Sequence, residues 1–114
     1  MNYRHIFFGV LVGTVAHMLS WFTNNSQFVW EFWNRRPLIS VLLFGIPSNI
    51  LFWYASNSLR AGTTNLWQTR WILFGLSFLP MMLLTNTLLG EPFFTYKNII
   101  TILLASLIIF VQLN

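Results

Sequence analysis

The sequence contains no cysteine and very little charge. Without cysteine the chain forms no disulfide, no thiolate metal site and no thiol nucleophile, and this absence says nothing about its redox compartment. Charged residues make up 7% of its 114 residues, against roughly a quarter in a water-soluble domain, so the composition excludes an ordinary soluble protein. The basic pI rests on six scattered lysine and arginine residues and does not describe a nucleic-acid-binding face.

Four long apolar segments occupy most of the chain. They cover residues 5–23, 38–56, 71–89 and 98–113. At about 1.5 Å per residue, each of the first three is long enough to cross the roughly 30 Å hydrocarbon core of a bilayer as a helix. In lipid the backbone must pair its polar groups internally, so we expect helices. The sequence therefore predicts an all-α membrane protein, in which residues 1–114 form a single domain of four transmembrane helices. It would be a multi-pass protein of a plasma or inner membrane.

The tryptophans and tyrosines support this placement of the spans. All six tryptophans and all three tyrosines lie near the ends of the segments or in the connections, which is the depth where amphipathic rings meet lipid headgroups. The first connection, residues 24–37, is rich in aromatic residues and ends with two arginines, so we expect it to lie flat in the interface. Residues 57–70 are expected to form a polar connection, and residues 90–97 a tight turn.

The positive charges are balanced between the two sides of the membrane. Short connections make successive helices antiparallel, so both termini are expected on one side. Three basic residues fall on each side: Arg4, Arg60 and Arg70 with the termini, and Arg35, Arg36 and Lys97 opposite. Either a subtler feature such as Arg4 sets the orientation, or the chain inserts both ways and pairs with an inverted copy.

The first segment places three special residues on one helix face. Gly9, Gly13 and His17 are spaced four residues apart, and the two glycines form a GxxxG motif that lets helices pack closely. His17 is ionisable, and such a residue within a span is costly and often functional. It either makes a structural contact with a headgroup or a carbonyl, or acts as a proton-coupled switch, for which an ordinary pKa of about 6.5 is suited.

The second and third segments each contain a proline near the middle. Pro47 and Pro80 each remove a backbone hydrogen bond and bend a helix, which frees carbonyl groups near the midplane of the membrane. Ser48 and Asn49 either satisfy such carbonyls or line a polar pocket at the depth where transporters bind substrate. The fourth segment is nearly all aliphatic and is expected to serve in packing or dimerisation.

The sequence offers no pattern for catalysis. Its two histidines, Glu31 and Glu91 do not have the spacing of metal ligands, and no serine–histidine–acid set or phosphate-binding loop is present. We therefore expect no enzyme activity, no catalytic residue, no metal and no cofactor. The expected partners are the lipid bilayer, a small-molecule substrate and a second copy of the chain, and not a nucleic acid.

Two short stretches in the second half of the chain carry a family resemblance. LRAGTTNLW, residues 59–67, leads into the third segment, and Gly90-Glu91-Pro92 precedes the fourth. Together with the length and the four spans, these stretches resemble the drug/metabolite transporter superfamily, on the scale of its small multidrug resistance branch. The resemblance implies a dual-topology, antiparallel homodimer that exports small cations or other compact solutes in exchange for protons.

One departure from that branch concerns the proton-coupling residue. The small multidrug resistance transporters carry an essential glutamate in their first span, whereas residues 13–17 here contain no carboxylate. His17 is therefore the candidate for proton coupling. The candidates for the walls of a substrate site are Ser48, Asn49, Tyr54 and Trp67.

Two classes of function follow from these patterns. The first is a small-solute transporter that works as a dimer, in which a broken helix would favour anions and aromatic walls would favour cations. The second is a non-catalytic structural or accessory subunit of a larger membrane complex, which needs no titratable group. Two spans broken by proline at polar midpoints favour the transporter, because a spacer would not require them.

Overall fold

The structure is a computed structural model that describes the backbone of residues 2–63 and 65–113 and the side chains as far as Val111. Within these residues the regular elements are all helical. In chain order they are α1 (Tyr3–Val29), a 3₁₀ turn (Glu31–Trp33), α2 (Pro37–Ser40), a π-helical turn (Val41–Gly45), α3 (Ile46–Gly62), α4 (Leu66–Leu76), α5 (Phe78–Leu88) and α6 (Tyr96–Leu113).

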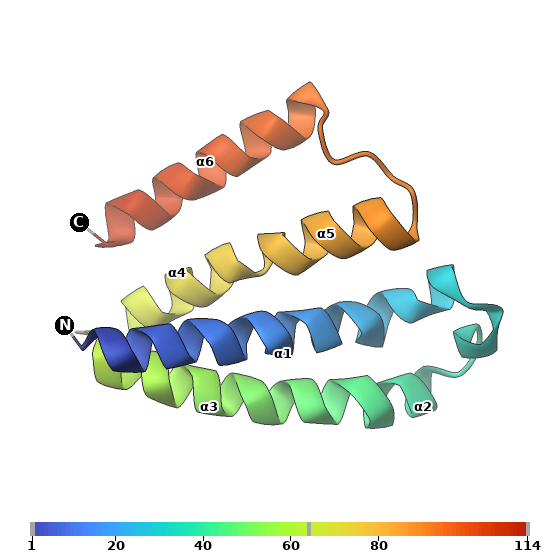
Figure 1. The fold of residues 1–114 in the computed structure, drawn as a ribbon, viewed down its shortest axis with the longest axis horizontal. Helices are drawn as coiled ribbons and strands as arrows, with labels where there is room; N and C mark the ends of the chain where they lie inside the picture. Colours follow the sequence, from blue (N-terminus) through green and yellow to red (C-terminus); the bar gives the residue numbers. More distant parts are fainter. Residues whose placement is uncertain (1, 64, 114) are drawn as a thin grey trace.

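The helices form four long segments, each antiparallel to the one before it (Figure 1). α1 packs along α3. The next two helices, α4 and α5, follow one another along the chain and both contact α1. Among the described elements, α6 contacts α4 alone. The beginning of α1 and the end of α6 lie at the same end of the molecule, as short connections predict. We call this the terminal end and the other, which holds the 3₁₀ turn, the opposite end.

α1 is longer than the sequence predicts. Its start is capped by Asn2, whose side chain accepts hydrogen bonds from the backbone N–H groups of Arg4 and His5. Its end lies at Val29, so residues 24–29, which we expected in an interfacial connection, are helical. The connection to the next helix is reduced to seven residues, Trp30 to Arg36, of which three form the 3₁₀ turn.

The second long segment remains helical through Pro47 because the backbone adjusts just before it. A π-helical turn precedes the proline and widens the helix, with the Ile46 N–H bonded to the Val41 carbonyl. Pro47 itself has no N–H to donate. Ser48 is buried, and its hydroxyl donates a hydrogen bond of 2.9 Å to the Gly45 carbonyl. Ser48 thus stabilises the backbone at the end of the π-helical turn.

The third long segment is broken into α4 and α5 at Ser77. Pro80 provides no N–H for the Leu76 carbonyl, so the regular ladder of helix hydrogen bonds is interrupted there. The Ser77 N–H lies 3.2 Å from the carbonyls of both Leu73 and Phe74, and its hydroxyl donates to the Phe74 carbonyl. The side chain of Ser77 therefore closes the end of α4.

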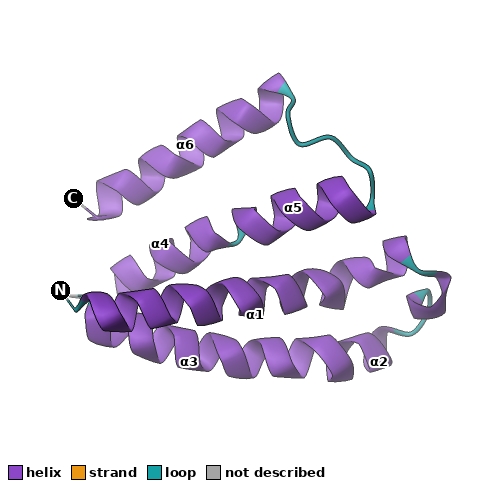
Figure 2. Cartoon of the chain, in the orientation of Figure 1, coloured by secondary structure: helices purple, strands orange, loops and turns teal. Residues whose placement is uncertain are grey.

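The other two expected connections also differ from the prediction. Residues 57–62 continue α3 and residues 66–70 begin α4, leaving only residues 63–65 between the helices. Polar side chains are tolerated there because they find partners: the Ser58 hydroxyl, for example, donates to the His5 carbonyl at 2.6 Å. Of the predicted tight turn at residues 90–97, residues 90–95 form an open loop between α5 and α6, and residues 96–97 begin α6 (Figure 2).

The outside of the molecule is apolar. Its shortest dimension is 18 Å, which is less than two helix diameters of about 10 Å each, so the helices cover little of one another. The buried apolar side chains of the described residues are few: Ala16, Trp21, Ala55, Leu59, Leu84 and Ala105. A water-soluble protein does not expose apolar surface on this scale.

Length and composition agree with a membrane protein. Three helical stretches are long and apolar enough to cross a membrane, and a fourth apolar helix is shorter. They are Tyr3–Val29, Pro37–Gly62 and Leu66–Leu88, followed by Tyr96–Val111. The described chain is thus an all-helical protein with three to four apolar helices compatible with a membrane bundle.

Candidate functional site

A cavity of about 340 Å³ opens between α3 and α4 with His17 of α1 in its wall. His17 follows Ala16, the middle residue of α1, so the cavity reaches the middle of the bundle. The other lining residues come from α3, from α4 and from the break after α4: Phe52, Ser56, Arg70, Leu73, Phe74 and Ser77. This volume falls in the range of small-molecule sites.

His17 is held in place by two contacts. Its Nε2 lies 2.8 Å from the Leu73 carbonyl oxygen, and since a carbonyl only accepts, Nε2 carries the hydrogen. The edge of its ring meets Phe52, with centroids 4.7 Å apart. The Leu73 carbonyl also accepts from the Ser77 N–H, so His17 bonds to the backbone beside the break between α4 and α5.

A second cavity, of about 430 Å³, continues the first toward the terminal end. The two share Ser56, Arg70 and Leu73, and the second adds Trp67 and Leu66 from the start of α4. Trp67 and His17, which the sequence offered as separate candidates, therefore lie along one groove. Arg70, one turn into α4, lies where the two cavities meet.

In the other half of the bundle, beyond the break at Ser77, α1 contacts α5. The Trp21 indole N–H donates to the Thr85 hydroxyl at 3.1 Å, which ties α1 to α5. Trp21 and Leu84 are both buried. The groove at His17 thus lies on one side of the break at Ser77, and the Trp21–Thr85 hydrogen bond lies on the other.

The remaining sequence candidates lie outside this groove. Ser48 is buried and hydrogen-bonded to its own helix. Tyr54 is exposed and pairs edge-on with Trp53 on the outer surface of α3. Asn49 is exposed, one turn before Phe52. None of the three lines either cavity.

Gly9 and Gly13 lie where helices touch most closely. A Cβ at Gly9 would lie 2.6 Å from Leu59 Cγ and 3.2 Å from the Ala55 carbonyl, both on α3. A Cβ at Gly13 would lie 3.0 Å from the side chain of Leu73 on α4. The GxxxG motif thus packs α1 against helices of its own chain and places His17 against α4.

Sequence reasoning missed Arg70 because it assigned residues 57–70 to a loop. The available signal was its position three residues after Trp67 and directly before an apolar run, where a long basic side chain remains near the interface. Ser56 and Ser77, which also line the groove, gave no signal of their own. Among residues 2–63 and 65–113, no three histidine or acidic side chains gather to hold a metal ion.

No family model, no curated protein and no solved structure matches this chain. The resemblance to drug/metabolite transporters thus rests on residues 59–67 and 90–92, of which Thr64 lies outside the described residues. The function must be argued from the groove itself.

Proposed function

We propose that this chain is a membrane transporter for a small solute, that it works as a dimer, and that its substrate is an anion. The observation that carries the proposal is the groove at His17, whose ionisable side chains are His17 and Arg70. The only acidic residues of the chain, Glu31 and Glu91, belong to connections at the opposite end. A bound solute therefore meets only basic or neutral groups.

The charge of Arg70 outweighs the attraction of the aromatic walls for a cation. Two unit charges about 4 Å apart interact by about 1 kcal/mol in water and about 4 kcal/mol near a protein surface. A cation over an aromatic face gains about 0.5–1 kcal/mol at an exposed site. Beside Arg70 an anion is thus favoured and a cation is repelled. The structure thereby favours one of the two substrate classes that the sequence left open.

Transport requires that the groove open to each side in turn, and the break at Ser77 supports such a movement. The break lies between the half that holds the groove with Arg70 and the half in which Trp21 bonds to Thr85. A rotation of α4 against α5 at this point would break the Trp21–Thr85 contact and close the groove near Trp67. His17 bonds to the Leu73 carbonyl next to the break, so its protonation is placed to influence this movement.

The exposed surface of α6 supports the dimer. α6 contacts only α4 among the described elements, and many of its side chains are large, apolar and exposed: Leu103, Leu104, Leu107 and Val111. A second copy, parallel or inverted, would cover this surface. We further propose a plasma or inner membrane, where ion and solute gradients can drive exchange.

The same surface supports one competing function, an accessory subunit that docks α6 against another protein. The mass of the particle solubilised in mild detergent separates the two. A transporter is expected to purify as a dimer of this chain, and an accessory subunit to retain foreign chains.

Uptake into proteoliposomes tests the transporter directly, with two probes of similar size and opposite charge. We expect benzenesulfonate to enter faster than phenyltrimethylammonium. Arg70→Gln should reduce benzenesulfonate uptake by about tenfold, the effect of losing one charge-assisted hydrogen bond. Arg60→Gln, which removes an exposed arginine from the same end but outside the groove, is the matched control. Preference for the cation, or equal loss in both variants, would refute an anion site at Arg70.

A further inference from the structure

The connection between α1 and α2 holds an arginine in an unusual backbone conformation. Arg35 has φ of 66°, in the left-handed region that glycine and asparagine adopt easily and that a longer side chain populates about fivefold to thirtyfold less. The loop is fixed on either side of it, with the Asn34 N–H bonded to the Glu31 carbonyl and the Arg36 N–H to the Trp33 carbonyl. Such strain is typical of functional positions.

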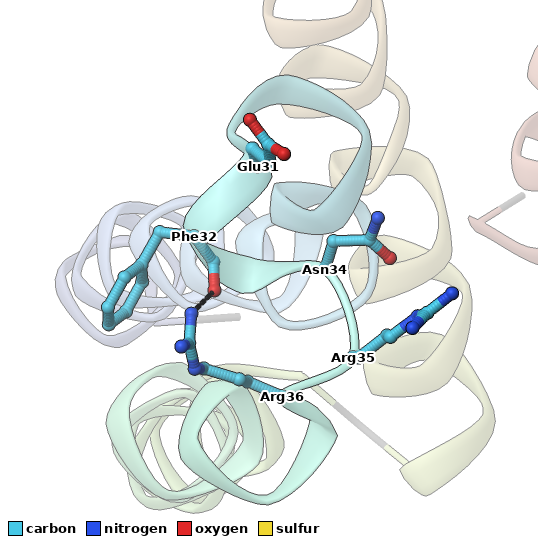
Figure 3. A pocket seen from close by; sticks show the side chains of 5 residues that line it. All are labelled: Glu31, Phe32, Asn34, Arg35 and Arg36. Atoms are coloured by element: carbon cyan, nitrogen blue, oxygen red, sulfur yellow. Dashed lines mark hydrogen bonds between the residues drawn. The ribbon is translucent and has the colours of Figure 1, made fainter.

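The two neighbouring arginines are used differently. The Arg36 guanidinium donates to the Phe32 carbonyl and lies 4.4 Å from the centre of the Phe32 ring, so the protein itself holds it (Figure 3). The Arg35 guanidinium has no hydrogen bond or ion pair within the described part of the chain. In Figure 3 it extends on the same side of the loop as the Asn34 amide, while the Glu31 carboxylate points in another direction.

Arg35 lies between two cavities with polar walls. The outer one, of about 710 Å³, is lined by the 3₁₀ turn and the loop, including Glu31. The inner one, of about 370 Å³, lies between α1 and α2 and shares Asn34, Arg35 and Arg36 with the outer one. Its lining includes the buried hydroxyl groups of Ser26 and Ser40, which lie 3.4 Å apart.

This loop lies at the depth of lipid headgroups. It joins the ends of two helices that are long enough to cross a membrane, and its flanking aromatic side chains Phe28, Trp30 and Phe32 are exposed. The amphipathic ring of Trp30 is of a kind typical of the membrane–water interface. The anion available to an arginine at that depth is a lipid phosphate, which a guanidinium binds with two parallel hydrogen bonds.

We propose that Asn34 and Arg35, at the mouth of the cavity between α1 and α2, bind the phosphate of an anionic phospholipid headgroup. The arginine supplies the charge and the amide of Asn34 a further donor. Arg36, held by Phe32, adds positive potential from the side. The site belongs to the opposite end of the molecule and does not depend on the groove at His17.

The test uses the purified full-length chain in detergent and three water-soluble probes. They are dihexanoyl phosphatidylglycerol, dihexanoyl phosphatidylcholine and inorganic phosphate, and each is titrated while the melting temperature is measured. We expect the phosphatidylglycerol to stabilise the protein at concentrations about tenfold lower than either other probe, because only it combines a net anionic phosphate with acyl chains.

The decisive variant is Arg35→Gly, which removes the guanidinium and also relieves the backbone strain, so it should fold at least as well as the parent. It should weaken the phosphatidylglycerol effect by about tenfold or more. Arg60→Gln, which removes an exposed arginine at the terminal end, should leave the effect unchanged. An undiminished effect in Arg35→Gly would overturn the site. Equal stabilisation by inorganic phosphate would overturn a lipid ligand, and equal stabilisation by phosphatidylcholine would overturn recognition of anionic charge.

Discussion

His17 combines a structural and a proposed functional role in one side chain. Its Nε2–H supports the Leu73 carbonyl beside the break in the third span, and its ring forms part of the groove wall. The sequence presented these roles as alternatives. The geometry shows that they are compatible, because the imidazole bonds to the backbone with one nitrogen and keeps a second that can take up a proton.

Two substitutions of His17 separate these roles. Gln carries an N–H that can reach the Leu73 carbonyl but does not titrate, whereas Leu does neither. We expect His17→Gln to match the parent in its free energy of unfolding and to lose the pH dependence of uptake. His17→Leu should in addition lower the free energy of unfolding by about 1 kcal/mol, the scale of one hydrogen bond between membrane helices. Unchanged pH dependence in His17→Gln would remove His17 from proton coupling.

At the scale of the elements, the apolar runs predicted where the helices are but not where they end. Each predicted span lies almost wholly within an observed helical stretch. The observed ends differ from the predicted ones because single side chains determine where a helix begins or ends. Asn65 caps α4 by accepting the Gln68 N–H. Near the end of α3, the hydroxyl groups of Ser58 and Thr63 donate hydrogen bonds to carbonyls. Hydropathy does not register such hydrogen bonds. Hydropathy likewise does not indicate that Arg70 lines a groove.

The close packing of α1 on α3 gives a prediction at this scale. Gly9→Ala should lower the free energy of unfolding by about 1–3 kcal/mol, because the new methyl group meets the fully buried Leu59 and the backbone of Ala55. Gly45→Ala is the matched control, since the nearest atoms there lie at an ordinary 3.4 Å, and it should change stability by less than about 0.5 kcal/mol. Denaturation in mixed micelles, followed by tryptophan fluorescence, gives both values. Similar values for the two variants would contradict the packing of the GxxxG face on α3.

At the scale of the whole molecule, basic residues occur equally at both ends. Arg4, Arg60 and Arg70 belong to the terminal end, and Arg35, Arg36 and Lys97 to the opposite end, as the order of the spans predicts. The spatial relation of His17, Arg70 and Trp67 could not be predicted in the same way. It depends on α4 crossing α1 beside α3, which no periodicity in the sequence specifies.

The equal number of basic residues at the two ends should make the orientation of the chain in the membrane easy to change. Two lysines added after Asn114 should drive the terminal end to the cytoplasmic side, since they change three against three to five against three. A reporter fused beyond them, read from each side of the membrane, measures the orientation. If the parent chain already shows a single orientation and the lysines leave it unchanged, insertion in both directions is refuted.

The most direct test of the proposed basic groove at His17 uses the absence of cysteine, which makes every introduced thiol unique. Ser56→Cys places a thiol where the two cavities meet, and Ser106→Cys places one on the exposed surface of α6 at mid-length. Each is treated in liposomes with a sulfonated and a trimethylammonium methanethiosulfonate, and rates are normalised to those of a free thiol. Ser56→Cys should react with both reagents and faster with the anion, and Arg70→Gln should remove that preference, while Ser106→Cys stays unlabelled. No labelling of Ser56→Cys, or a preference for the cation, would contradict an anion-selective groove.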